Sequence, residues 1–204
     1  MIGIIDYGLG NIKAFENIYK RLHIPVKRLY NAEDFDGITH LILPGVGAFD
    51  HAMQTFNHSG MREISEKLVL ENKTPVLGIC VGMQMLAKSS DEGTLPGLGW
   101  VEGKVKKFDE TKISFDTHLP HMGWNDVEVN SDNTLFKDFP VGPKFYFLHS
   151  YYFECHHSKD SIAMSDYGVT FTCAVNYANI FGVQFHPEKS HEYGIRLLDN
   201  FSKL

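Results

Sequence analysis

A cysteine between two glycines, at the end of an apolar run, is the first feature of this sequence that could do chemistry. The segment "PVLGICVGMQ", residues 75–84, places Cys80 between Gly78 and Gly82. A nucleophile at a sharp strand-to-helix turn adopts strained backbone angles, and flanking glycines remove side chains that would collide with neighbouring elements. The N-terminus of a following helix would stabilise the reactive thiolate. Taken alone, "GICVG" fits a nucleophile and a buried structural cysteine equally well.

A cysteine nucleophile needs a base, and the chain has eleven histidines to choose from. His186 follows apolar residues in "VQFHPEKS", residues 183–190, where Pro187 ends the strand and Glu188 comes two positions after the histidine. A carboxylate at this spacing can accept a hydrogen bond from the imidazole and fix its tautomer. A lone histidine at a strand end is more often structural. The order Cys80, His186, Glu188 nevertheless favours a catalytic triad.

A third segment, "LILPGVGAF" at residues 41–49, places Gly45, Val46 and Gly47 after a strand that Pro44 is expected to end. Such a loop can turn peptide N–H groups toward an anion, and its glycines allow two conformations. The N–H of Val81, directly after Cys80, is a second candidate donor to an oxyanion. An ordinary strand-to-helix turn explains the loop as well when the loop is taken alone.

The elements that must position these residues alternate between strands and helices in the first half of the chain. The patterns predict strands over 2–6, 26–30, 38–45 and 75–79, and helices over 11–22 (with Asn11 as N-cap), 48–56, 61–72 and 81–88. Alternation of this kind predicts a parallel sheet. From residue 97 onward, short strand patterns over 99–108, 144–153, 161–167, 169–177 and 180–186 indicate antiparallel additions. A last helix is expected over 190–204, capped by Ser190, and the whole chain, 1–204, is expected to form a single α/β domain.

Composition argues against several classes of function. The net charge of −6, without a basic stripe, argues against a nucleic-acid partner. No run reaches the roughly 18 apolar residues of a membrane span, and no signal peptide is recognisable, so we expect no membrane partner and a cytoplasmic location. Three cysteines without clustered spacing predict no disulfide framework. No metal site is expected, because the histidines, including the pair His156–His157, have no evident carboxylate or cysteine complement.

Together these segments resemble the class I (triad) glutamine amidotransferases. "PGVGAF", "GICVGMQ" and "QFHPEKS" are similar to the oxyanion loop, nucleophile elbow and His-Pro-Glu segment of that family. "DYGLGN" at 6–11, "PHMGWN" at 120–125 and "YFLHSY" at 146–151 narrow the resemblance to its HisH-type glutaminase subunits, over essentially the whole chain. The resemblance implies a flavodoxin-like α/β fold: a mixed central sheet with helices on both faces and antiparallel additions in the C-terminal half. It implies no cofactor.

The resemblance also implies a role for each matching residue. Cys80 would attack the side-chain amide of L-glutamine, His186 would move the proton, and Glu188 would orient the histidine. The oxyanion hole would lie in the loop Gly45–Gly47 and use the N–H groups of Val46 and Val81. The glutamine head would be held by a group of residues that match the family's clamp, namely Gln84, Glu92, His149, Ser150 and Tyr151. For Glu92, an ordinary solvated turn residue is the alternative.

The same resemblance implies a partner protein, a HisF-type (β/α)8 cyclase that receives the ammonia and makes imidazole glycerol phosphate in histidine biosynthesis. The residues expected to face this partner are Asn11, His121, Met122, Trp124, Asn125 and Lys189. Tryptophan is a frequent anchor of protein interfaces, although Trp124 could equally be a core aromatic.

Two questions stay open at this point. "GLGW" around Trp100 and "HPEKSH" are typical of HisH-like paralogues that supply ammonia to a HisF-like partner for surface-sugar synthesis, so the ammonia acceptor is undecided. Cysteine hydrolases and chaperone-like proteins share the elbow but generally lack the His-Pro-Glu segment and the glutamine clamp. A non-catalytic binding module is expected to have lost its nucleophile or base, whereas Cys80 and His186 are both present.

Overall fold

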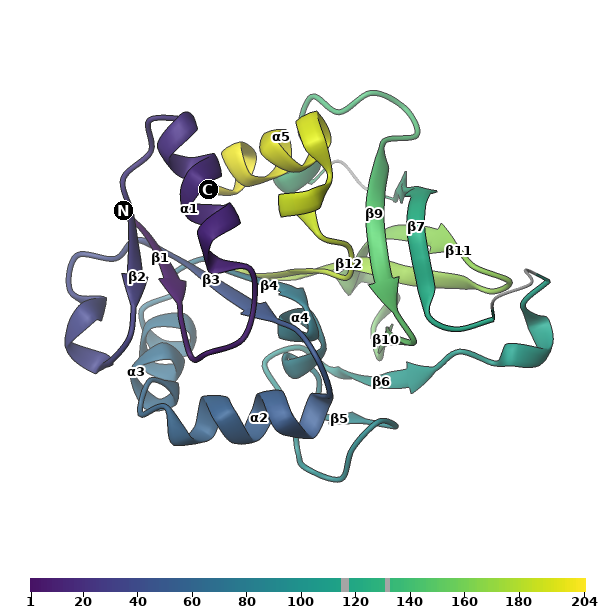
Figure 1. The fold of residues 1–204 in the computed structure, drawn as a ribbon, viewed down its shortest axis with the longest axis horizontal. Helices are drawn as coiled ribbons and strands as arrows, with labels where there is room; N and C mark the ends of the chain where they lie inside the picture. Colours follow the sequence, from purple (N-terminus) through teal and green to yellow (C-terminus); the bar gives the residue numbers. More distant parts are fainter. Residues whose placement is uncertain (115–117, 131–132) are drawn as a thin grey trace.

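A large mixed sheet runs through the molecule in the computed structural model, which describes residues 1–114, 118–130 and 133–204 (Figure 1). Its strand order is β2-β1-β3-β4-β13-β12-β10-β6-β5. The first five strands in that order are parallel: β2 (Val26–Leu29), β1 (Ile2–Ile5), β3 (His40–Gly45), β4 (Val76–Cys80) and β13 (Ile180–Val183). Strands β1, β3 and β4 are buried along their whole length, as continuous apolar runs predict for a sheet covered on both faces.

The second half of the chain extends this sheet mostly by antiparallel pairing, as expected, except that β13, from the run 180–186, also pairs with β4 in parallel. Beyond β13 lie β12 (Thr170–Tyr177), β10 (Tyr151–Cys155), β6 (Gly103–Lys107) and the short β5 (Ser89–Ser90), which pairs with β6 in parallel. Strand β11 (Ser161–Asp166) pairs with β12 and with β8 (Glu128–Val129). A separate two-stranded antiparallel sheet consists of β7 (His121–Asp126) and β9 (Lys144–His149).

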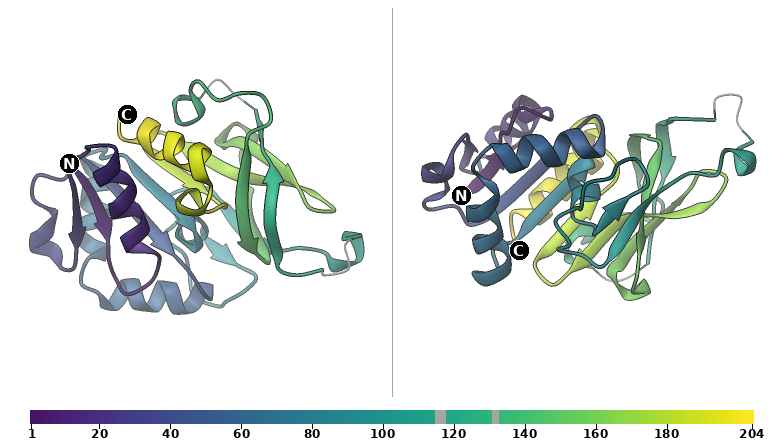
Figure 2. Two further views of the ribbon diagram at one scale, coloured as in Figure 1. Left: turned by 45° about the horizontal axis from the view of Figure 1, so that its top comes forward. Right: turned by 90° about the horizontal axis from the view of Figure 1, so that it is seen from below.

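Helices cover both faces of the parallel half (Figures 1 and 2). On one face lie α1 (Ile12–Arg21) and α5 (His191–Phe201), and on the other lie α2 (Phe49–His58), α3 (Arg62–Glu66) and α4 (Val81–Met85). Short helical turns are η1 (Ala32–Phe35), η2 (Lys67–Glu71), η3 (Glu110–Lys112), η4 (Thr134–Phe136), η5 (Ser158–Asp160) and η6 (Pro187–Lys189). The fold class predicted from the sequence is therefore confirmed.

Several predicted boundaries are wrong, for reasons that lie in tertiary contacts. The helix expected over 81–88 ends at Met85, because loop N–H groups from residues 98–101 take the carbonyls of Met85, Leu86 and Ala87. The helix expected over 61–72 divides into α3 and the π-helical turn η2. Strand β3 begins at His40, two residues after the expected start, and ends at Gly45, so that Pro44 lies within the strand rather than ending it. Asn11 precedes α1, but its side chain makes no capping hydrogen bond.

Candidate active site

The backbone at Cys80 is strained, as a nucleophile elbow requires. Cys80 ends β4 with φ +55° and ψ −113°, in a region that non-glycine residues rarely occupy. Such a conformation costs on the order of 1–3 kcal/mol and persists only where the surroundings impose it. A Cβ atom at Gly78 would lie 2.7 Å from the carbonyl oxygen of Gly82, and one at Gly82 would collide with the carbonyl oxygen of Leu43. Gly78 therefore lets α4 pack closely on β4, and Gly82 lets the start of α4 pack closely on β3.

The helix after Cys80 is shorter than the sequence suggests. It can therefore stabilise a thiolate at Cys80 less than expected. Helix α4 has five residues, and a helix this short has only a small dipole at its N-terminus. The charge most able to stabilise a thiolate at Cys80 is therefore that of His186 rather than that of the helix.

His186 and Glu188 form a buried pair beside Cys80. The Nδ1 atom of His186 lies 2.9 Å from Oε1 of Glu188, and the two side chains are 5% and 3% exposed. Burial lowers the pKa of His186, but hydrogen bonds to Cys80 and to Glu188 outweigh it and raise this pKa to about 10. The structure thus brings the three expected triad residues together, with a histidine that favours its protonated form.

The loop Gly45–Gly47 lies directly beside Cys80. Gly45 is opposite Cys80 in the β3–β4 pairing, and Gly47 has φ +83°. The loop is held just before and just after these glycines. The Tyr7 hydroxyl donates to the carbonyl oxygen of Pro44 (2.7 Å), and the N–H of Phe49 donates to the Glu92 carboxylate (2.9 Å). Conformational freedom is therefore confined to the segment between Pro44 and Phe49.

A cavity of about 280 Å³ contains most of the residues that the sequence nominated. Its lining includes the members of the elbow, the loop, the clamp and the base, namely Val46, Gly47, Cys80, Val81, Gln84, Glu92, His149, Ser150, Tyr151, His186 and Lys189. These residues come from five separate segments of the chain, brought together at the carboxyl ends of β3 and β4 and at the turn from β9 to β10. Open α/β sheets bind ligands at this edge.

Gln184 is a residue of this site that the sequence reasoning missed. Its side chain is fully buried, its Oε1 accepts a hydrogen bond from Nε2 of Gln84 (3.0 Å), and its Nε2 lies 3.8 Å from Sγ of Cys80. Gln84 also donates from Nε2 to the carbonyl oxygen of Tyr151 (3.2 Å). A polar residue between Val183 and Phe185, inside an apolar strand pattern, was the available signal.

Ser190 holds the backbone of His186 in place rather than capping the last helix. The N–H of Tyr146 donates to Oγ of Ser190 (3.0 Å), and this hydroxyl donates to the carbonyl oxygen of His186 (2.6 Å). Ser190 is fully buried and makes no side-chain capping bond to α5. Ser190 therefore occupies the expected N-cap position of α5, but its side chain does not cap the helix.

We expect Ser190→Ala to lower the free energy of unfolding by about 2 kcal/mol, since it leaves a buried N–H and a buried carbonyl without this partner. The matched control is Ser202→Ala, near the C-terminus, where the hydroxyl donates to the carbonyl of Asp199 and a change within about 0.5 kcal/mol is expected. Urea denaturation of both variants measures the difference. Equal stability of the two variants would show that the hydrogen bonds of Ser190 do not stabilise the fold.

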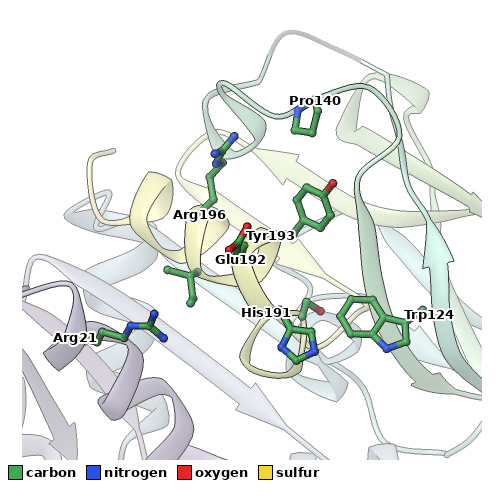
Figure 3. Close-up of a pocket in the computed structure, with 9 residues that line it drawn as sticks. Arg21, Trp124, Pro140, His191, Glu192, Tyr193 and Arg196 are labelled. Carbon is green, nitrogen blue, oxygen red and sulfur yellow. The ribbon is translucent and has the colours of Figure 1, made fainter.

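The residues expected at a partner interface divide into two groups. Asn11 and Lys189 are exposed, and Met122 and Trp124 are 63% and 47% exposed. Trp124 stacks on His191 with a centroid distance of 5.2 Å, at the side of a hollow of about 750 Å³ that Arg21 and Arg196 also line (Figure 3). The alternative that Trp124 is a core aromatic is therefore wrong.

His121 and Asn125 lie on the other face of β7, where the His121 ring is buried and the Asn125 side chain is half-buried, and their place at an interface stays a prediction. His121 is 3% exposed, and the Asn125 side chain donates inward, to the carbonyl oxygen of Asp166 (2.7 Å). The reason is the two-residue period of a strand: His121 and Asn125 lie on one face of β7, and Met122 and Trp124 lie on the other.

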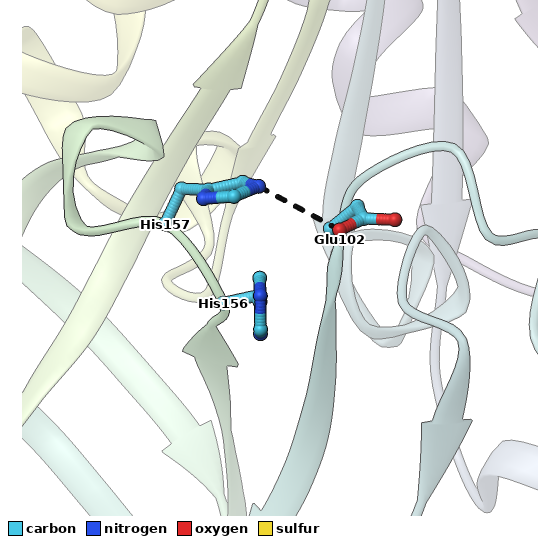
Figure 4. Close-up of side chains that lie close together, drawn as sticks. All are labelled: Glu102, His156 and His157. Atoms are coloured by element: carbon cyan, nitrogen blue, oxygen red, sulfur yellow. Dashed lines mark ion pairs between the residues drawn. The ribbon is translucent and has the colours of Figure 1, made fainter.

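A second cluster of polar side chains lies near the far end of β10 from Tyr151. Glu102, His156 and His157 have ligand atoms within 4.8 Å of one another (Figure 4), so the histidine pair does have the carboxylate that the sequence reasoning did not find. All three are exposed, and Glu102 also accepts a hydrogen bond from the Lys88 ammonium. That cation competes with any metal ion, so the arrangement is a surface ion-pair network.

The sequence is similar, over nearly its whole length, to proteins of one known family. The sequence profile described as "Glutamine amidotransferase class-I" matches residues 4–203. The chain is 59% identical, over the full length of both, to the imidazole glycerol phosphate synthase subunit HisH of Bdellovibrio bacteriovorus. It is 52% identical, again over both full lengths, to the subunit of the same name from Leptospira interrogans.

Solved structures show the same fold at low sequence identity. A glutamine amidotransferase from Thermotoga maritima superposes with a TM-score of 0.65 at 22% identity, covering 99% of this chain and 82% of that one. In the described part of the chain, no helix is both long enough and apolar enough to cross a membrane. The profile match and the full-length relatives show that the chain belongs to the class I glutamine amidotransferases and, within them, to the family of HisH subunits.

Proposed function

We propose that this chain is the glutaminase subunit of an imidazole glycerol phosphate synthase, which hydrolyses L-glutamine at Cys80 and passes the ammonia to a HisF-type (β/α)8 cyclase. The observation that carries the proposal is that Cys80 and His186 line one cavity beside a glycine-rich loop, while the buried Glu188 carboxylate contacts Nδ1 of His186. The subunit names of the full-length relatives support the partner and the pathway. The cysteines of the described residues are free thiols, which suits a reducing compartment, and we place the reaction in the cytoplasm.

The first half of the reaction forms a thioester. The Cys80 thiolate attacks the side-chain amide carbon of glutamine, and an electron pair moves to the amide oxygen, where the N–H groups of Val46 and Val81 would stabilise it. As the tetrahedral intermediate collapses, the carbon–nitrogen bond breaks. The imidazolium of His186 gives its proton to the nitrogen, which leaves as ammonia. The glutamyl group stays on Cys80.

The second half releases glutamate. A water molecule gives a proton to the neutral His186 and attacks the thioester carbon, and the carbon–sulfur bond breaks. Glu188 accepts from Nδ1 of His186, so that Nε2 is the nitrogen that exchanges protons with Cys80 and water. The raised pKa of His186 favours the imidazolium form that a thiolate nucleophile needs at rest.

The clamp residues would hold the amino-acid head of glutamine in the cavity. One carboxylate oxygen of Glu92 accepts from the N–H of Phe49 (2.9 Å), and the other can accept from the substrate's α-ammonium group. The same carboxylate anchors α2 next to the glycine loop, so substrate binding at Glu92 and the position of that loop are connected. Ser150 and Tyr151 would contribute donors to the α-carboxylate. Gln84 also lines the cavity, and its amide is held by its bonds to Tyr151 and Gln184.

A partner would dock at the edge of the sheet where this cavity opens. Exposed apolar side chains gather there on the two-stranded sheet: Met122 and Trp124 on β7, and Leu148 on β9. Contiguous exposed apolar side chains mark protein interfaces. The Lys189 ammonium lies 5.7 Å from the centroid of the Tyr146 ring. Lys189 also lines the cavity and so connects the reacting residues with this surface. Ammonia released at Cys80 would therefore leave toward the partner.

The acceptor distinguishes the two pathways left open by the sequence. The relatives' names favour imidazole glycerol phosphate synthesis over amination of a surface-sugar precursor. Expression of the chain with its own HisF-type partner should restore growth of a histidine auxotroph that lacks both subunits. Failure of a well-expressed pair that hydrolyses glutamine would favour the surface-sugar alternative.

We expect the isolated chain to hydrolyse glutamine slowly, and the rate to rise at least about tenfold in the complex with an acceptor analogue. The reason is that the free loop segment can turn one oxyanion donor away, and one such donor is worth roughly 10²–10³-fold in rate. Docking stabilises the competent conformation by differential contact. A coupled glutamate assay on the chain alone and on the complex measures the ratio.

Trp124→Ala should weaken the complex or its stimulation and leave Cys80 reactive toward iodoacetamide. The matched control is Tyr177→Ala at the end of β12, an aromatic residue of similar exposure (50%) outside this surface, which should have no effect. An isolated chain as fast as the stimulated complex would contradict the coupling.

A further inference from the structure

We propose that His121 is a positioning residue for the glutamine cavity: through His149 it holds the turn at Tyr151, so that the docking strand β7 and the substrate pocket share one directed hydrogen-bond chain. The inference rests on the proposed function, because it names a residue that serves the same cavity. His121 itself does not line that cavity, and its side chain is turned away from the exposed face of β7.

The chain of hydrogen bonds is continuous from β7 to the cavity. Nδ2 of Asn125 lies 3.2 Å from Nε2 of His121, and Nδ1 of His121 lies 3.1 Å from Nε2 of His149. Nδ1 of His149 lies 2.8 Å from the carbonyl oxygen of Tyr151. His121 and His149 are 3% and 6% exposed, so water does not replace these contacts readily.

The direction of the chain follows from Asn125. Its Nδ2 donates to the carbonyl oxygen of Asp166 (2.7 Å), and its Oδ1 accepts from the N–H of Asp126 (2.8 Å), so the amide cannot be reversed without losing both bonds. Nε2 of His121 must then accept, and the single proton of a neutral His121 lies on Nδ1. That proton is donated to Nε2 of His149, which leaves the proton of His149 on Nδ1, facing Tyr151.

Burial keeps both rings neutral, as this order of bonds requires. It lowers the pKa of His121 to about 4. The pKa of His149 falls to about 3 through burial, with smaller contributions from His121 and His186. At neutral pH each histidine therefore carries one proton. The bond between the two rings then has one donor and one acceptor.

Aromatic packing fixes the position of the His121 ring. It stacks on Phe147 (centroid distance 4.8 Å, interplanar angle 20°) and on Tyr167 (4.1 Å, 20°). A phenyl ring at position 121 can keep both stacks but has no nitrogen. His121→Phe therefore removes the donor to His149 while it preserves the packing.

Loss of that donor acts on the pocket through the Tyr151 carbonyl. This oxygen accepts from both His149 (2.8 Å) and Gln84 (3.2 Å), and Tyr151 and Ser150 line the cavity. Without the N–H of His121, the buried Nε2 of His149 has no donor, and the His149 ring loses the bond that holds it against the Tyr151 carbonyl. The turn from β9 to β10 loses a cross-link, whereas no bond of the Cys80 side chain itself is removed.

The test compares two reagents that both label Cys80 in the isolated chain. A diazoketone analogue of glutamine, 6-diazo-5-oxo-L-norleucine, needs the glutamine pocket, whereas iodoacetamide needs only the thiol. In His121→Phe, the second-order rate constant for the analogue should fall at least tenfold, and that for iodoacetamide should stay within twofold. Asp126→Asn, at the exposed end of β7 and on the face opposite His121, should change neither constant. Equal losses with both reagents, or no loss with the analogue, would overturn the proposal.

A pair of amide variants separates hydrogen bonding from packing. The amide of His121→Asn lies near the former Nδ1 position and can still donate to His149, whereas the amide of His121→Gln reaches the former Nε2 position. The asparagine variant should therefore recover analogue labelling in part, and the glutamine variant should not. The reverse order would contradict the assignment.

A measurement on the unmodified chain keeps the proposal testable if the variants fold poorly. Nitrogen-15 spectra of the imidazole rings should show His121 and His149 both as Nδ1–H tautomers at pH 7, and an Nε2–H tautomer at either ring would overturn the directed chain. Failure of the proposed function would look different. In that case the unmodified chain would react with iodoacetamide but not with the glutamine analogue, whatever the tautomers are.

Discussion

Cys80→Ala should abolish glutamine hydrolysis and leave the fold intact. Removal of the nucleophile in an enzyme that forms a covalent intermediate costs at least roughly 10⁴-fold in rate. Alanine places no new atom at the elbow, where Gly78 and Gly82 leave room only for the existing backbone. In the complex with its partner, synthesis driven by a high ammonia concentration should survive at alkaline pH, because free ammonia bypasses this subunit.

The control for this variant is Cys155→Ala. Cys155 is a half-buried thiol at the end of β10, outside the cavity, and its replacement should leave the glutaminase rate nearly unchanged. Glutamine-dependent and ammonia-dependent synthesis are measured on the same preparations. Retained glutamine turnover in Cys80→Ala would remove Cys80 from the mechanism.

His186→Ala should lose more activity than Glu188→Gln. The imidazole gives and takes protons, a contribution of roughly 10²–10⁴-fold, whereas Glu188 only orients the ring and stabilises its charge. Glu188→Gln keeps a hydrogen-bond acceptor near Nδ1 but removes the negative charge. The pKa of His186 should therefore fall in that variant, because Glu188 is one of the groups that raise it.

Steady-state kinetics in the partner complex and an NMR titration of His186 measure the two effects. Glu192→Gln, in the exposed first turn of α5, is the matched control and should change neither the rate nor the titration. If His186→Ala and Glu188→Gln both kept the unmodified rate, the base would have to be another histidine of the cavity, with His149 the next candidate.

Local pattern was enough to predict the elements that carry the chemistry. Apolar runs ending in glycine, cysteine or proline predicted the buried strands β3 and β4, and the order of strands and helices predicted the parallel half of the sheet. The residues around Cys80 and His186 converge because carboxyl ends of neighbouring parallel strands meet at one edge. That outcome follows from the topology. The alternation did not predict it, because the strand before His186 was expected among the antiparallel additions, whereas β13 pairs with β4 in parallel.

Features that depend on distant segments could not be predicted in the same way. Helix α4 is short because a loop some ten residues away takes its carbonyls. The carboxylate near His156 comes from Glu102, directly before the neighbouring strand β6. The alternation along "HMGWN" predicts that His121 and Trp124 lie on opposite faces of a strand. Only the tertiary structure shows that the face with His121 is the covered one.

The measurement that tests the central claim most directly is the mass of the peptide that contains Cys80, taken from the partner complex after rapid acid quenching during glutamine turnover. The account predicts a transient increase by one glutamyl group on Cys80. Glu188→Gln should show the same adduct, and Cys80→Ala should show none. Steady turnover of glutamine with no adduct on Cys80 at any quench time, or with the adduct on another residue, would contradict the account.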